Sequence, residues 1–193
     1  MSTMTTRPGC VRVLLILGYG LGVWLLPHAA PWPGLTHRML WEAFGIILAL
    51  TSLMDLFTSQ IFQIWPLIAM GLWAGWFGLQ VLFGAYFVVM PIVRGVAIDG
   101  GVLGLWPFIL RRFGSRLARG DWLVYGVGAL YLSVAPGYFV LWLMGGFLLV
   151  HAFHRMLQTF RLSLTTVPFL PFALVAYLLV AVVWPHLPPR ATL

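Results

Sequence analysis

The sequence predicts an all-α, polytopic transmembrane bundle of about six spans, and three observations carry this prediction. Hydrophobic residues make up 62% of the 193 residues. Only 8% of the residues are charged, whereas an ordinary soluble domain has roughly 25%. The basic residues, all of them arginine, gather in short segments between long apolar runs. This composition argues against a water-soluble enzyme, a disordered chain and a disulfide-stapled secreted domain.

The first apolar run, Val13–Leu26, follows a polar start that contains Arg7 and Arg12. A charged start before a short apolar core resembles a signal peptide. His28 occupies a position where cleavage requires a small residue. We therefore expect a retained helix over 13–27, with cleavage of this segment as the alternative.

The longest apolar run, Ile61–Ile98, contains a single formal charge, Arg94. As one helix its 38 residues would measure about 57 Å, at ~1.5 Å per residue, against a hydrocarbon core of ~30 Å. The run must therefore fold back. We expect the reversal at Gly75 and Gly78, with the helix pair ending at Asp99-Gly100-Gly101.

Val102–Leu110 is too short to cross a bilayer and is followed by four arginines. It is predicted to be a short interfacial segment before an Arg-rich cytoplasmic loop. The next long apolar run, Trp122–Phe153, is either one kinked span or two short helices, because Pro136-Gly137 permits a kink or a turn. We predict one membrane domain over 1–193, with the Arg-rich segment at 102–121. The expected spans lie near 13–27, 39–57, 60–76, 79–98, 122–153 and 162–184. A break of the fifth span at 136–137 is the alternative.

The distribution of arginines helps to choose the number of spans, because cytoplasmic loops are enriched in Arg and Lys. Five spans divide the arginines 7 to 4, six spans 8 to 3, and seven spans 9 to 2. The charge rule alone favours seven, while helix length disfavours a second hairpin. We favour six, and five and seven remain open.

Two carboxylates in the second predicted span are candidates for an ion or proton site. A carboxylate at the centre of a membrane costs about 2.5–3.5 kcal/mol, so it usually faces a partner or a water-filled cavity. The alternatives are an Arg38–Glu42 ion pair and a polar helix end whose side chains bond to one another. The candidate ion or proton site comprises Asp55, Glu42, Thr51, Ser52 and Ser59.

Basic side chains at the span ends are candidates for contact with anionic lipid headgroups. Two histidines three residues apart lack the further ligands that a metal site needs, so we expect no metal and no cofactor. Gly71-x-x-x-Gly75 offers a close-packing face that we expect to be used within the chain. The candidate lipid contacts are Arg111, Arg112, Arg116, Arg119, His151, His154 and Arg155.

The leading functional hypothesis is a non-catalytic membrane protein, such as a subunit, assembly factor or organiser of a complex. The alternative is a small secondary transporter or channel that uses Asp55 or Glu42, and the third is a lipid-headgroup enzyme. Expected partners are membrane lipids and other membrane proteins or further copies of the chain, and nucleic acid is not expected. The absence of Lys and Asn suggests GC-rich coding, so we expect a bacterial cytoplasmic membrane with the N-terminus in the cytoplasm.

Overall fold

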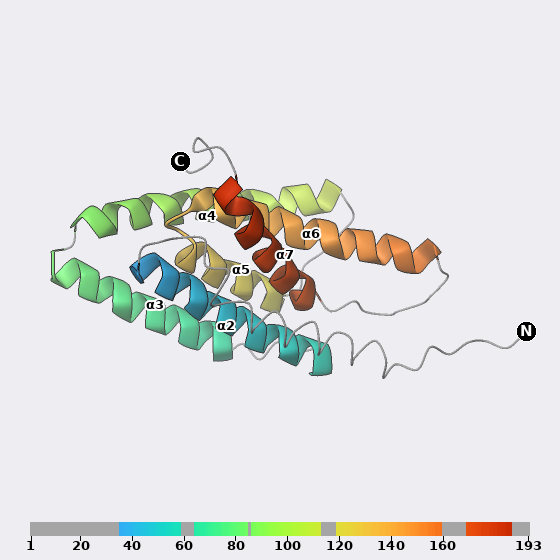
Figure 1. Ribbon diagram of the computed structural model, residues 1–193, viewed down its shortest axis with the longest axis horizontal. Helices are drawn as coiled ribbons and strands as arrows, with labels where there is room; N and C mark the ends of the chain where they lie inside the picture. Colours follow the sequence, from blue (N-terminus) through green and yellow to red (C-terminus); the bar gives the residue numbers. More distant parts are fainter. Residues whose placement is uncertain (1–34, 59–63, 85, 113–118, 160–168, 187–193) are drawn as a thin grey trace, which may run out of the picture.

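The computed structural model describes residues 35–58, 64–84, 86–112, 119–159 and 169–186, all in helices or short turns (Figure 1). The predicted all-α bundle is confirmed, and no strand occurs in these ranges. The predicted first span at 13–27 lies outside them. The helices are α2 (Leu35–Thr58), α3 (Ile64–Leu82), α4 (Tyr86–Arg112), α5 (Arg119–Tyr131), α6 (Pro136–Thr159) and α7 (Leu170–Val183), with the 3₁₀ turn η2 (Trp184–His186) after α7.

Three of these helices are long and apolar enough to cross a membrane: α3, α4 and the part of α6 from Pro136 to Leu157. Many of their large apolar side chains face outward, such as Phe87, which is 93% exposed, and Leu82, which is 81% exposed. Soluble monomers rarely expose large contiguous apolar surfaces. The described helices are therefore compatible with a membrane protein.

Helices α2 to α6 run in alternating directions along the long axis of the bundle, and α7 crosses them obliquely (Figure 1). The α3–α4 turn and the α5–α6 turn lie toward one end, and α2, α4 and α6 finish toward the other. Arg111 and Arg112 close α4, and Arg155 lies in the last turns of α6. These three arginines therefore share one end of the bundle, and Arg38, near the start of α2, belongs to the opposite end.

The reversal between α3 and α4 lies further along the chain than the sequence predicts. Gly75 and Gly78 are inside α3, so the expected turn at these glycines is wrong. The helix ends after Leu82, and Gly84 adopts a φ of 68°. Only glycine takes this left-handed conformation without strain, which makes Gly84 the residue that terminates the helix.

α4 continues through Asp99-Gly100-Gly101, so Val102–Leu110 is the second half of one helix and not a separate segment. Two glycines do not break it because the helix is anchored on both sides of them. Its buried residues lie at the three- and four-residue spacing of one helical face. They are Ile92, Gly95, Asp99, Trp106 and Leu110.

The chain does turn at Pro136, where the sequence left a turn and a kink open. α5 ends at Tyr131, and Pro136 is the first residue of α6, the helical position that proline favours. The 13 residues of α5 give a length of about 20 Å, less than the hydrocarbon core of ~30 Å. The α5–α6 turn therefore ends short of the tip of the α3–α4 hairpin (Figure 1).

An aromatic cluster of Trp41, Tyr138 and Tyr177 connects α2, α6 and α7. The Trp41 indole N–H donates to the Tyr138 hydroxyl (3.1 Å), and the Tyr177 hydroxyl donates to the Trp41 carbonyl (2.7 Å). The Tyr138 hydroxyl in turn donates to the Tyr177 carbonyl. Trp41 and Tyr177 also stack, with ring centroids 5.0 Å apart. Each buried polar atom of this cluster is thus satisfied by a neighbouring helix, which fixes the packing of the three helices.

Candidate functional site

Asp55 and Ser52 both bind backbone groups of Leu170, the first residue of α7. The Leu170 amide donates to the Asp55 carboxylate (3.1 Å), and the Ser52 hydroxyl lies 3.0 Å from the Leu170 carbonyl. The Phe169 amide also donates to Asp55. A carboxylate that accepts amide bonds at a helix N-terminus satisfies free donors and opposes the positive end of the helix dipole. These contacts favour a structural role for Asp55.

The other members of the predicted ion or proton site do not converge on Asp55. The Thr51 hydroxyl donates back to its own helix, with the carbonyl oxygens of Ile47 and Leu48 at 2.9 and 3.1 Å. Glu42 pairs with Arg38 at 2.8 Å on the outside of α2, four residues away. Ser59 lies outside the described residues.

The predicted lipid contacts lie mainly at the end of the bundle where α4 and α6 finish. Arg111, Arg112, His154 and Arg155 are exposed, as headgroup contact requires. His151 stacks on Phe147 at 6.1 Å. Arg116 lies outside the described ranges, as does the side chain of Arg119, the first residue of α5. In the part of the chain that the structure describes, no three His, Cys, Asp or Glu side chains come together to hold a metal.

Asp99, which the sequence analysis did not select, is the most unusual charged residue in the structure. Its exposed fraction is 0%, and it lies in the middle of α4. Neither carboxylate oxygen has a hydrogen-bond partner among the described residues. Buried polar atoms in proteins nearly always have a hydrogen-bond partner. The burial of this carboxyl group is therefore explained by a bound proton, by a bound ion or by a functional role.

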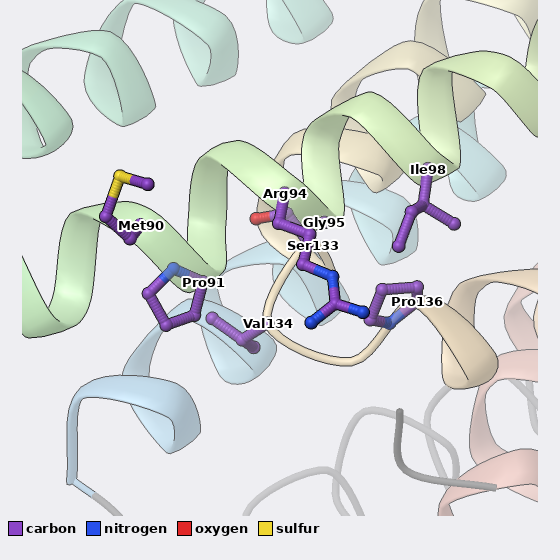
Figure 2. A pocket seen from close by; sticks show the side chains of 8 residues that line it. All are labelled: Met90, Pro91, Arg94, Gly95, Ile98, Ser133, Val134 and Pro136. Carbon is purple, nitrogen blue, oxygen red and sulfur yellow. The ribbon is translucent and has the colours of Figure 1, made fainter.

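A pocket of about 410 Å³ lies between α4 and the α5–α6 turn. Figure 2 shows the Arg94 side chain extending from α4 toward Pro136, with Met90 and Pro91 on one side and Ile98 on the other. Arg94 is exposed, and no hydrogen bond or ion pair joins it to another described residue. The pocket thus combines a cation with apolar walls.

Gly95 allows the α5–α6 turn to approach α4 closely enough to form this pocket. A Cβ atom at Gly95 would lie only 1.6 Å from the carbonyl oxygen of Ser133. Only a residue without a side chain fits there. The position of the turn beside Arg94 is therefore set by a backbone-to-backbone contact.

Asp99 and Arg94 both stood out in the sequence, but each was used only to predict where the chain crosses the membrane and turns. Asp99 precedes two glycines, a pattern typical of a loop, so it was used to end a span. Arg94 served in the count of arginines on each side. What the sequence could not supply was the continuity of α4, which places both charges inside a 27-residue helix.

Comparison of the chain with known protein families, curated proteins and solved structures found no match. The functional argument therefore rests on the geometry of Asp99 and of the Arg94 pocket.

Proposed function

We propose that this protein is a small secondary transporter or channel of the membrane, with Asp99 as the carboxyl group that carries a proton or a cation. The single observation behind the proposal is the complete burial of Asp99, without a partner for either oxygen in the described part of the chain. The residue stands 13 positions from each end of α4. It is thus the intramembrane carboxylate that the transporter hypothesis requires, in a different helix from the one expected.

The physical chemistry supports this assignment. Moving an isolated ionised carboxylate into an apolar interior costs several kcal/mol or more, so the group is neutralised by a proton or a paired cation. Ionisable residues inside membrane helices commonly mark ion and proton pathways. Asp55 offsets the cost of its burial by accepting hydrogen bonds from α7. Asp99 accepts none from the described residues.

The same contacts reassign the carboxylates of the original hypothesis. Asp55 binds the start of α7, and Glu42 forms an exposed ion pair. Both therefore have structural partners, and Asp99 replaces them as the candidate transport residue.

We expect Asp99→Asn to abolish proton flux, because the amide cannot take up or release the proton. The measurement is the acidification of liposomes that contain the purified protein and a pH-sensitive dye, under an imposed ion gradient. We expect a loss of about a hundredfold or more, the usual size of the effect when a group that transfers a proton is removed. Asp99→Glu should retain part of the flux.

Glu42→Gln is the matched control, since it removes a carboxylate that the structure shows paired and exposed. It should leave flux unchanged. Thermal melting in detergent should show both variants folded. Equal flux in wild type and folded Asp99→Asn would refute the assignment.

The setting of this activity is also a proposal. The arginines at the α4 and α6 ends support a cytoplasmic location for that end of the bundle, and we place the N-terminus on the same side. A bacterial cytoplasmic membrane agrees with the lysine-free composition. Anionic lipids are the proposed partners of the exposed arginines.

A second candidate function, a subunit or organiser of a membrane complex, is favoured by the open face of α3. Gly71, Gly75 and Gly78 have no atom of another described helix within 4 Å of a Cβ position. None of the described helices supplies the intramolecular packing expected for Gly71 and Gly75. Such small-residue faces let membrane helices approach one another closely, so we propose that a second copy of the chain packs here.

A further inference from the structure

We propose that the groove between α4 and α6 binds one anionic phospholipid, with its phosphate at Arg94 and an acyl chain along the two helices. This site is independent of Asp99 and goes beyond the proposed transport function. It also lies away from Arg111, Arg112 and Arg155, the basic residues predicted to contact lipid.

The headgroup end of the groove is the pocket of about 410 Å³ that holds Arg94. A guanidinium group that stays unpaired near lipid is costly, and an anionic ligand removes that cost. Arginine binds phosphate oxygens through two parallel hydrogen bonds. Pro136 also lines this pocket, so the positive end of the α6 helix dipole lies beside it and reinforces the attraction for an anion.

The acyl end is a second cavity of about 290 Å³ between the same two helices. All of its lining residues are apolar, among them Val102 and Leu105 from α4 and Val140 and Met144 from α6. Leu105 is 63% exposed and Met144 is 47% exposed. The cavity therefore opens sideways toward lipid, so its occupant enters from the bilayer.

The two cavities share one face of each helix. On α4 the residues that line them recur every three or four positions, through Pro91, Arg94, Ile98, Val102 and Leu105, as residues on one helical face do. From Arg94 to Leu105 the helix rises about 16 Å at ~1.5 Å per residue, close to one leaflet of a ~30 Å hydrocarbon core. The rise from Arg94 to the apolar cavity thus matches the separation between the phosphate of a phospholipid and its acyl chain in one leaflet. Asp99 lines neither cavity, so its carboxylate does not face the bound phosphate.

The test is native mass spectrometry of the full-length protein, purified in mild detergent and incubated with dioleoyl phosphatidylglycerol or dioleoyl phosphatidylcholine. The wild type should retain one phosphatidylglycerol in preference to phosphatidylcholine. Arg94→Gln should lower its retention about tenfold or more, as expected for the loss of a charge-assisted contact. Met144→Trp, which fills the apolar cavity from its rim, should lower retention as well.

Each variant has a matched control on the same helix. Arg112→Gln removes the same charge from α4 outside the groove, and Met156→Trp adds the same ring to an exposed position of α6, where Met156 is 46% exposed. Met156→Trp should bind as the wild type does, and Arg112→Gln, at an exposed helix end beside Arg111, should lose far less of the single retained lipid than Arg94→Gln. The proposal is overturned if Arg94→Gln and Arg112→Gln lose lipid equally, if the two lipids are retained equally, or if Met144→Trp binds like Met156→Trp. Thermal melting without added lipid checks that all four variants are folded.

Discussion

Gly95 and Gly100 are five residues apart in α4, yet a methyl group at each should have opposite effects. A Cβ at Gly95 would overlap the Ser133 carbonyl oxygen at 1.6 Å, whereas a Cβ at Gly100 meets no atom within 4 Å in the described structure. Gly95→Ala must push the α5–α6 turn away from α4 and should destabilise the protein by about 1–3 kcal/mol. Gly100→Ala should stabilise it by about 0.5–1 kcal/mol, because alanine loses less conformational entropy in a helix.

Thermal unfolding of the two variants in the same detergent measures this difference. Gly95→Ala should also remove the preference for phosphatidylglycerol, since the turn forms one wall of the Arg94 pocket. Equal melting temperatures for both variants would show that α4 and the turn are not in contact.

Individual acidic residues show what a sequence can and cannot reveal at this scale. The Arg38–Glu42 ion pair follows from their four-residue spacing in one helix, and the structure contains it. The contact between Asp55 and Leu170 joins residues 115 positions apart, so no local sequence pattern predicts it. Asp99 resembled a helix end because an acidic residue followed by two glycines usually is one.

At the scale of the element, α3 is a helix with one side packed and one side open. Pro66 and Ala69 are its buried residues, and its glycines at 71, 75 and 78 face outward. If a second copy packs there, Gly75→Leu should convert a dimer to a monomer in mild detergent, because the added side chain blocks close approach of the two backbones.

Light scattering coupled to size-exclusion chromatography measures this change in mass. Gly100→Leu, at an equally open position of α4, should leave the dimer intact. A monomeric wild type would contradict the proposed role of the α3 face.

Element lengths also explain why some helix boundaries were predicted and others were not. Pro136 was one of two alternatives, a turn or a kink, and the structure shows the turn because proline lacks a backbone N–H donor and starts a helix readily. The α3–α4 turn was misplaced because several glycines lie near the middle of the run, and only the tertiary structure selects Gly84. α4 crosses Gly100 and Gly101 because Ile92 and Gly95 before them and Trp106 and Leu110 after them are held in contacts.

At the scale of the whole molecule, the alternating helix directions predict which loops share a side of the membrane. The α4 and α6 ends should lie on one side and the α3–α4 turn on the other (Figure 1). Counting the predicted first span and α2 to α7, we expect seven passes from this arrangement, one more than the six favoured from the sequence. α5 is short for a full crossing, so its pass ends inside the bundle.

Accessibility of single cysteines tests this arrangement. In a Cys10→Ser background, a cysteine at Arg112 and one at Thr159 should react with a membrane-impermeant thiol reagent from the same side. A cysteine at Phe83, which is 83% exposed, should react from the opposite side. Reaction of positions 83 and 112 from one side would rule out the alternation.

The sequence alone established the helical class and the apolar character of the chain, and it offered the turn at Pro136 and the pairing of Arg38 with Glu42 each as one of two alternatives. Each depends on composition or on residues within a few positions of one another, where helix geometry fixes the distance. The packing of the helices decided that Asp55 binds α7, that Asp99 is buried without a partner among the described residues, and that Arg94 faces the α5–α6 turn. These depend on which helices pack together, and in a chain this uniformly apolar many packings satisfy the same hydrophobic pattern, so burial alone could not choose among them.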